Sequence, residues 1–226
     1  MKNILLIMTL LLAGLVARAG EPYSCTQPGR TLTYERTKAN GRLERTTTMA
    51  YTTVRRVGDA RYVDCILTVY GPGGGEQFGG PSKQTTLITA DGTVSQDLAA
   101  SMKAVIHNMF PGASQSAEGT PAILPADMKP GDKLPDGHAV VKTGIMTHTM
   151  DIIEREVLRF ERITVPAGTF DCVVLREHKI EHGIGRNRDT VCENWYAPGV
   201  GPVRHDSYNY NNGNPVFGAR EVLKKY

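Results

Sequence analysis

Turn-forming residues divide most of this chain into long segments rich in threonine and valine. The clearest turn signals are Asn40-Gly41, Gly58-Asp59, Pro166-Ala167-Gly168 and Pro198-Gly199. Glycine and asparagine tolerate positive φ and proline fixes φ near a turn value, so the chain can reverse at each site. Extended segments separated by tight turns at regular spacing pair as an antiparallel meander. The sequence therefore predicts a mainly β protein.

The predicted strands are unusually long. A typical strand has about 5–6 residues, and Leu43–Val57 is more than twice that length. Long, twisted, threonine-rich strands suit a single curved antiparallel sheet, and we predict a half-barrel. The stretch Gly112–Pro125 is predicted to be a polar loop. The expected strands are Arg30–Lys38, Leu43–Val57, Arg61–Tyr70, Gln84–Ile88, Thr93–Ser95, His138–Thr143, Ile145–Ile163, Thr169–Glu177, Asp189–Tyr196, Val203–Tyr210 and Val216–Lys224.

One amphipathic helix is predicted over Asp97–Phe110. Ser95 or Asp97 can cap its start, and Pro111-Gly112 ends it. A lone helix in a β protein must bury its apolar stripe on a sheet, so we expect it on the concave face. The stripe recurs at helical spacing and consists of Leu98, Met102, Val105, Ile106 and Met109.

The first 19 residues have the pattern of a secretory signal peptide. Lys2 supplies the positive start, Ile4–Val16 is apolar, and Ala17-Arg18-Ala19 is a cleavage site. A transmembrane anchor is the alternative, but the apolar run is shorter than the ~20 residues of a span. No cysteine follows the site directly, which disfavours a lipoprotein. We therefore expect residues 20–226 to form one β-rich domain, without a transmembrane anchor, that is periplasmic or secreted in a Gram-negative bacterium.

The charge of the chain is nearly balanced once the signal peptide is set aside. The formal net charge is +3, and cleavage would remove Lys2 and Arg18. A nucleic-acid-binding protein would carry a basic stripe or patch, and none is visible in the sequence. We therefore expect no nucleic-acid partner.

Four cysteines remain in the exported chain: Cys25, Cys65, Cys172 and Cys192. An even number in an oxidising compartment predicts two disulfides, with three possible connectivities. A hairpin turn near His182-Gly183 would place Cys172 opposite Cys192, which would leave Cys25 to pair with Cys65. Zinc ligation is the alternative, but the spacings lack any C-x2-C pair.

Two motifs in the C-terminal half carry a family resemblance. Thr164–Cys172 reads TVPAGTFDC, and Trp195–Gly201 reads WYAPGVG. Together with Lys129–Asp136 and Met146–Met150, they resemble the TapB family, a group of exported bacterial proteins related to domains of unknown function. The resemblance implies a β-rich, half-barrel-like envelope protein, similar in shape to periplasmic lipoprotein carriers. It implies no activity, because a fold alone fixes no function.

The segment Ile145–Ile163 fits two secondary structures. Its apolar residues Met150, Ile153, Val157 and Phe160 match a helical stripe. We predict a strand, because the flanks are rich in threonine and valine, Pro166 follows without a helix cap, and the family resemblance supports it. As a strand, the segment needs a bulge between Ile153 and Leu158, where the apolar alternation changes parity.

Catalytic and cofactor motifs find little support. The glycine-rich stretch Gly71–Gly80 lacks the Lys-Ser/Thr of a phosphate-binding loop, and neither G-x-S-x-G nor H-E-x-x-H occurs. The carboxylates Glu35, Glu44 and Glu154 are scattered and are expected to face solvent, although a glycosidase-type pair can assemble only in three dimensions. We therefore predict no catalytic residues, no metal site and no cofactor, and a non-enzymatic protein.

Methionines suggest where a ligand could lie. Met146, His148 and Met150 alternate, so one strand face presents all three; they suit Cu(I), although an apolar face with a tolerated histidine is the simpler interpretation. The candidate groove residues are Met102, Met109, Met146 and Met150. We expect the concave sheet to bind an apolar or amphipathic ligand, such as a lipid or a lipoprotein segment. The alternatives are a structural or interaction protein with a filled core and, less well supported, a hydrolase.

Overall fold

The computed structural model describes residues 20–183, 186–211 and 214–226. The expected signal peptide, residues 1–19, lies outside the described residues. The elements in chain order are β1 (Thr31–Lys38), β2 (Leu43–Val57), β3 (Ala60–Tyr70), β4 (Ser82–Ile88), β5 (Val94–Gln96), α1 (Leu98–Met109), β6 (Gln115–Thr120), β7 (Ala122–Leu124), β8 (Gly137–Thr143), β9 (Met146–Val165), β10 (Gly168–Gly183), β11 (Arg186–Ala197), β12 (Gly201–Asn211) and β13 (Asn214–Lys225).

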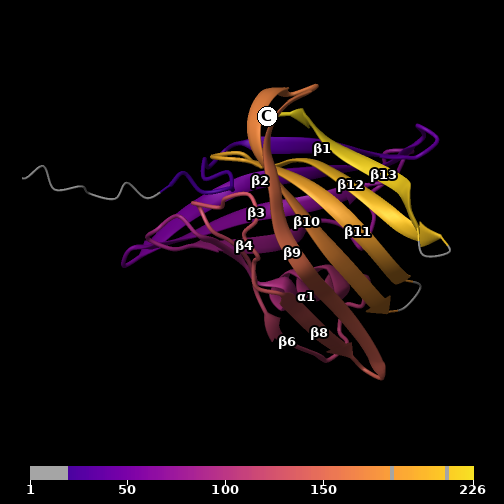
Figure 1. Ribbon diagram of the computed structural model, residues 1–226. Coiled ribbons are helices and arrows are strands. Elements are labelled where there is room, and N and C mark those ends of the chain that lie inside the picture. The colour runs from indigo at the N-terminus through magenta and orange to yellow at the C-terminus, as the bar shows by residue number, and fades with distance from the viewer. Residues whose placement is uncertain (1–19, 184–185, 212–213) are drawn as a thin grey trace, which may run out of the picture.

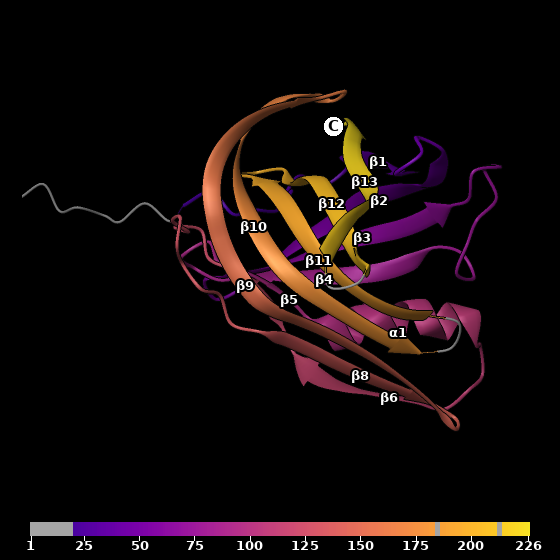
Figure 2. The same ribbon diagram turned by 45° about the vertical axis from the view of Figure 1, so that its right-hand side comes forward.

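Across the described residues, thirteen strands form one antiparallel sheet in the order β6-β8-β9-β10-β11-β12-β13-β1-β2-β3-β4-β5-β7. The sheet curves strongly and nearly closes on itself (Figure 1, Figure 2). Its two edge strands, β6 and β7, are separated in sequence only by Pro121. The predicted fold class, a mainly β protein with a single curved antiparallel sheet, is confirmed, and the curvature goes beyond a half-barrel.

The predicted helix is confirmed, and it lies on the inner side of the sheet next to the seam between the edges. The Asp97 carboxylate accepts a hydrogen bond from the Ala100 N–H at 2.8 Å, and Phe110 ends the helix. α1 contacts β4 on one side of the seam and β6 and β8 on the other. Its buried residues Leu98 and Ala99 pack in a small apolar cluster with Ala122, Ala139 and Ile152. The helix therefore fastens the two ends of the sheet together.

One end of the barrel is filled. The segment before β1 crosses it, and the carbonyl of Pro22 accepts a hydrogen bond from the Gly199 N–H at 2.8 Å. Tyr23 and Cys25 are buried there with residues of the main core, among them Val94 and Leu124. The opposite end carries the β1–β2, β3–β4 and β8–β9 connections. The interior is therefore packed at one end only.

The strand prediction for Ile145–Ile163 is confirmed, and so is the need for a bulge. β9 runs without interruption from Met146 to Val165, and its pairing with β10 shifts register twice opposite residues 153–159. Glu154 has a φ of 53°, which is unusual for a residue other than glycine. The bulge reorients the apolar residues, so the helix-like stripe fits a bent strand.

The prediction of a loop over Gly112–Pro125 is wrong, because β6 and β7 lie within it. Residues of β6 after Gln115 are all exposed, so this edge strand carries no apolar alternation. β7 has only three residues. Neither strand has the periodic pattern that strand prediction depends on.

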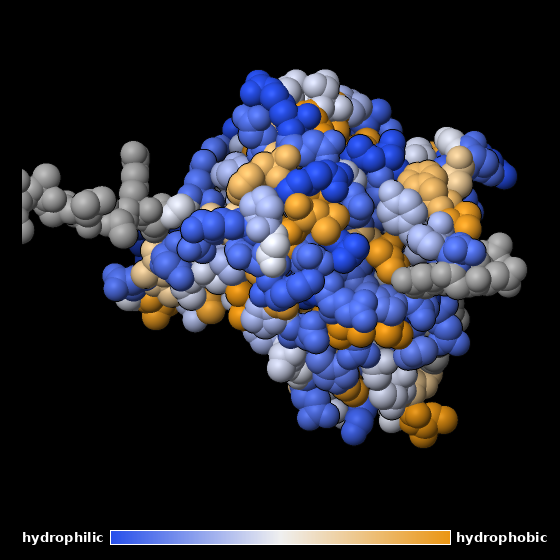
Figure 3. All heavy atoms as spheres, in the orientation of Figure 1, coloured by the Kyte–Doolittle hydropathy of each residue, from blue (hydrophilic) through white to orange (hydrophobic). Residues whose placement is uncertain are grey.

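On the outer face of the sheet, charged side chains surround two buried residues, Trp195 and Asp206. Figure 3 shows that one view of this face is mostly hydrophilic, with scattered hydrophobic residues. Trp195 is a packing residue: its Nε1–H donates to Glu161, and Arg204 lies 4.2 Å from its ring centre. Asp206 is fully buried and accepts two hydrogen bonds from Arg220 at 2.8 Å and two from Arg204.

The Asp206 anchor predicts a measurable loss of stability when its charge is removed. Asp206→Asn should lower the free energy of unfolding by about 2 kcal/mol, because it breaks a buried, hydrogen-bonded charge cluster. Asp171→Asn is the matched control: Asp171 and its partner Arg162 are largely exposed, so the change should cost less than about 0.5 kcal/mol. Urea unfolding at pH 7 measures both, and equal stability of Asp206→Asn and the wild type would contradict the assignment.

The same cluster sets the acid dependence of stability. Burial alone would raise the pKa of Asp206, but hydrogen bonds from Arg220 and Arg204 outweigh it and hold the pKa below its usual range. The carboxylate therefore stabilises the fold above about pH 4, its ordinary pKa, and this stabilisation is lost as the pH falls through the lower folded pKa. Unfolding curves should show the difference between wild type and Asp206→Asn shrinking only in strong acid.

Candidate functional site

A cavity of about 810 Å³ lies inside the sheet, between α1 and the concave face. This volume falls within the range of small-molecule sites, roughly 300–1,000 Å³. Its apolar wall comes from α1, from the inner faces of β2 and β3, and from the β3–β4 connection. The apolar residues on this side are Met49, Leu67, Val69, Phe78, Leu98, Met102, Val105, Ile106 and Met109. The aromatic residues Tyr23, Tyr34 and Tyr51 border the cavity toward the filled end.

A second hollow of about 580 Å³ lies under β1, β2 and β10 to β13, and it is polar. It reaches the β1–β2 turn at Asn40, on the side of the barrel opposite the filled end. The two hollows share five lining residues: Arg45, Lys179, Glu181, Arg188 and His205. They therefore form one continuous interior space with an apolar side and a charged side.

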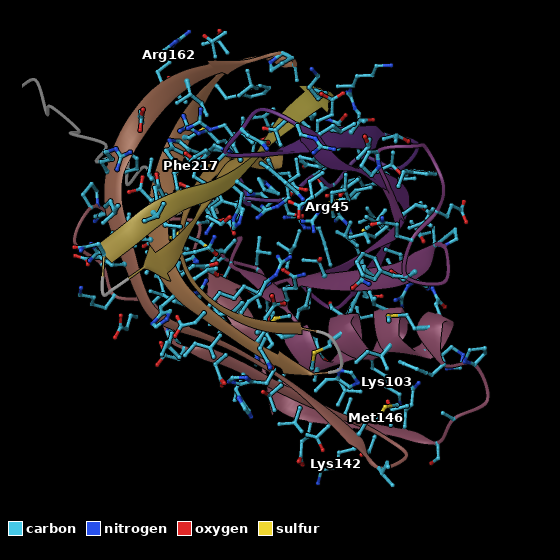
Figure 4. All side chains as sticks on the ribbon, turned by 90° about the vertical axis from the view of Figure 1, so that its right-hand side faces the viewer. Arg45, Lys103, Lys142, Met146, Arg162 and Phe217 are labelled. Carbon is cyan, nitrogen blue, oxygen red and sulfur yellow. The ribbon has the colours of Figure 1, made fainter. Side chains whose placement is uncertain are left out.

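The charged side is built from ion pairs of side chains on β1, β2, β10 and β13. Arg36 bonds Glu44 at 2.9 Å and the Ser207 hydroxyl at 2.7 Å. Arg45 bonds Glu221 at 3.3 Å, and Figure 4 shows Arg45 inside the ring of strands. Lys179 lies 3.3 Å from Glu181. Carboxylates on the inner face therefore compensate part of the basic charge.

His205 is a neutral residue at the centre of this charged side. Its pKa is lowered to about 3, first by burial and then by the positive charges of Arg36, Lys179 and Arg45; Asp206 acts in the opposite direction. The Nδ1–H of the neutral ring donates a hydrogen bond to the side-chain oxygen of Asn194. The ring is therefore uncharged near neutral pH, chiefly because it is buried, and the three cations add to this effect.

Two buried polar atoms of the cavity wall have no hydrogen-bond partner among the described residues: the side-chain oxygen of Gln84 and Nε2 of His148. Gln84 uses its amide nitrogen on Ser82 and on the carbonyl of Ser101. Buried polar groups are nearly always paired with protein or water. These two atoms are exceptions to that rule, and both belong to residues of the cavity wall.

The structure brings together most of the residues predicted for a ligand groove. Met102, Met109 and Met150 line the cavity, and His148 lines it as well. Met146 lies at the start of β9 and is not part of the wall. Among the described residues, no group of three or more histidine, cysteine, aspartate and glutamate side chains could hold a metal ion.

Sequence reasoning missed the charged side of the cavity. Arg36, Arg45 and Lys179 lie in segments predicted to be strands, in which a charged residue is ordinarily expected to face solvent. Glu44 was expected to face solvent, and it instead pairs with Arg36 beside the polar hollow. One signal was available in β1. Arg36 follows Leu32 and Tyr34 at every second position, so it lies on the same face of the strand as these two buried residues.

The predicted pairing of Cys172 with Cys192 is wrong in its register. Gly183 pairs with Arg186, so Val173 faces Tyr196 and Cys192 faces Glu177. The hairpin therefore turns about two residues later than the glycine signal at His182-Gly183 suggested. All four cysteines of the chain are described, and each is a buried free thiol in this structure.

Burial also makes these thiols unreactive. It raises the pKa of Cys65 and Cys192 to about 11 and the pKa of Cys172 to about 12. A thiol reacts as its thiolate, which these groups do not form near neutral pH.

Comparisons with known proteins agree with this architecture. The model of a family described as DUF3108-like matches residues 27–215. The chain belongs to the DUF3108-like family. The TapB assignment suggested by the motifs stays a resemblance, and a search of curated proteins finds no match. Among the described residues, α1 is too short and too polar to cross a membrane, and no other helix qualifies.

Two solved structures resemble this DUF3108-like chain along nearly their whole length. A candidate exported protein with a YmcC-like fold from Bacteroides fragilis NCTC 9343 has a TM-score of 0.70 and 20% identity, covering 89% of this chain and 97% of its own. A candidate lipoprotein from Parabacteroides distasonis ATCC 8503 has a TM-score of 0.72 and 18% identity, covering 92% of this chain and 99% of its own. At this identity the likeness concerns the fold.

The low pKa of His205 predicts that the protein loses stability in mild acid. The unfolded chain takes up a proton near the ordinary histidine pKa of about 6.5, whereas the folded ring takes it up only near pH 3. The free energy of unfolding should therefore fall as the pH drops from 7 to 5. His205→Asn should reduce that slope, and His107→Asn, on the exposed side of α1, should not. Urea unfolding at each pH gives the slope, and NMR of the His205 ring checks the protonation directly.

Proposed function

We propose that this protein is a non-enzymatic binding protein of the cell envelope that holds an apolar or amphipathic ligand inside its sheet. The ligand class that fits is a lipid or the acylated segment of a lipoprotein. The observation that supports this proposal is the interior cavity of about 810 Å³, with α1, β2, β3 and the β3–β4 connection as its apolar wall.

The shape of the interior favours binding over a purely structural role. A structural protein with the same sheet would fill its concave side with side chains, since protein interiors are close-packed. Here side chains pack the filled end of the barrel. The rest of the interior contains a cavity, even though α1 lies on the inner side of the sheet. Methionines at four positions of the wall, Met49, Met102, Met109 and Met150, can adapt to a flexible chain.

The proposed location outside the cytoplasm rests on the signal-peptide pattern of residues 1–19. The two structural relatives, described as a candidate exported protein and a candidate lipoprotein, are consistent with it. We propose a periplasmic or secreted protein of a Gram-negative bacterium, whose ligand comes from the envelope.

The direct test is recovery of the ligand. Residues 20–226, produced in the periplasm and purified without detergent, should contain a stoichiometric lipid that native mass spectrometry detects and lipid extraction identifies. After delipidation, the protein should bind a fluorescent fatty-acid probe. A protein that is purified empty and also fails to bind the probe would overturn the proposal in favour of a structural role.

A substitution that fills the cavity should abolish binding. Leu67 lies on the inner face of β3 and lines the cavity, whereas Ile66, its neighbour, points to the outer face. Leu67→Trp should weaken probe binding by about tenfold or more, because the indole occupies the space of the ligand. Ile66→Trp is the matched control and should leave binding unchanged. Equal binding by both variants would place the probe outside the cavity.

A further inference from the structure

We propose that the ligand is an anionic amphiphile, whose head group is bound by Arg45 and Lys179 and whose apolar chain lies between α1 and β2 to β4. This inference rests on the proposed function and adds the chemical class of the ligand. It depends on three features of the interior: the excess of basic side chains, the position of these side chains, and the continuity of the charged and apolar sides.

Basic side chains outnumber acidic ones around the interior space. The basic residues along the two hollows are Arg36, Lys38, Arg45, Lys179, Arg188 and Arg204, and the acidic ones are Glu44, Glu181 and Glu221. Arg204 is bound to Asp206 on the outer face and does not contribute to the interior charge. Five basic groups therefore face three carboxylates, although the mature chain as a whole is nearly balanced. An excess of one charge along a cavity with low-dielectric walls attracts ligands of the opposite sign.

The carboxylates present are already engaged. Glu44 is paired with Arg36, Glu221 accepts hydrogen bonds from Arg45 and Thr47, and Glu181 lies beside Lys179. A cationic ligand would have to compete with these arginine and lysine partners. An anionic head group would share Arg45 and Lys179 with Glu221 and Glu181, and it would add a negative charge to a region where basic groups outnumber carboxylates. Arg36, Lys179 and Arg45 also contribute, after burial, to the lowered pKa of His205.

The basic groups sit where the head group of an amphiphile would be expected. Arg45 lies two residues inside the start of β2, next to the β1–β2 turn at the unfilled end. Tyr34, Tyr51 and Cys65 border the cavity deeper, toward the filled end, and α1 covers its other side. A ligand can therefore keep its charged group near the opening and bury its chain against apolar residues. Arg45 and Lys179 line both hollows, so the head group and the chain occupy one continuous space.

A carboxylate and a phosphate both satisfy this chemistry, because arginine and lysine bind either oxyanion. The test therefore uses ligands with one chain and different head groups. Delipidated wild-type protein is titrated with hexadecanoate, hexadecyl phosphate and hexadecanol, and also with acetate and inorganic phosphate, which lack the chain. Displacement of a neutral fluorescent probe gives each affinity.

The expected result is that at least one of the two anionic amphiphiles binds about tenfold tighter than hexadecanol, and that acetate and inorganic phosphate bind far more weakly. The stronger of the two anions then identifies a fatty acid or a phospholipid as the source. Arg45→Gln combined with Lys179→Gln should remove the preference for the anion and leave the affinity for hexadecanol unchanged. Arg162→Gln combined with Lys142→Gln is the control, because both side chains point away from the interior in Figure 4.

The possible failures are distinguishable. If hexadecanol binds as well as the anions, the inference is overturned while the proposed function stands. If no ligand with a chain binds, the proposed function itself fails. If acetate or inorganic phosphate binds as tightly as the amphiphiles, the site is a simple anion site and the chain has no role. Should the double variant not fold, the wild type still decides: higher salt should weaken binding of the anions and not of hexadecanol.

Discussion

The seam between β6 and β7, the two edge strands of the sheet, is the constraint on which the rest of the fold depends. An open curved sheet exposes unpaired backbone groups at both edges. Here the edge strands β6 and β7 follow each other with only Pro121 between them, and α1 packs on strands from both sides of the gap. Proline has no N–H to leave unpaired, and β7 is only three residues long, so little edge is exposed there. Fixing the seam with a helix on the inner side keeps the sheet rolled and leaves a cavity beside the helix.

The interior that results is expensive for the protein to maintain. Arg36, Glu44, Arg45 and Glu221 lie on the inner side, where apolar residues would stabilise the fold more simply. Moving a charged pair out of water costs hydration free energy, and the attraction between the two charges offsets only part of that cost. An unfilled cavity adds a further cost, because its walls lack packing partners. Charged groups and empty space placed together, beside a well-packed end, are more easily explained by a binding role than by stability.

The sequence predicted the strands, the helix and even the bulge in β9, because each has a local signature. Leu43–Val57 is rich in threonine and lies between two turn signals, Leu98–Met109 repeats at helical spacing, and the parity change near Glu154 requires a bulge in any strand. What failed depends on long-range geometry. β6 has no pattern because it is exposed on both faces, and the position of Cys192 opposite Glu177 depends on a two-residue difference in the turn. Arg45 was not among the candidate groove residues, because the sequence of a strand does not say which of its two faces a closing sheet turns inward.

Strand β12 shows how one segment can serve stability and binding separately. Successive side chains of a strand point to opposite faces. Arg204 and Asp206 point outward and join Arg220 in the buried charge cluster of the outer face, whereas His205 and Ser207 point inward and border the polar hollow. The outer positions hold neighbouring strands together, and the inner ones shape what the cavity can hold. Within such a sheet, ligand preference can change through inner residues while the ion pairs that maintain the barrel stay the same.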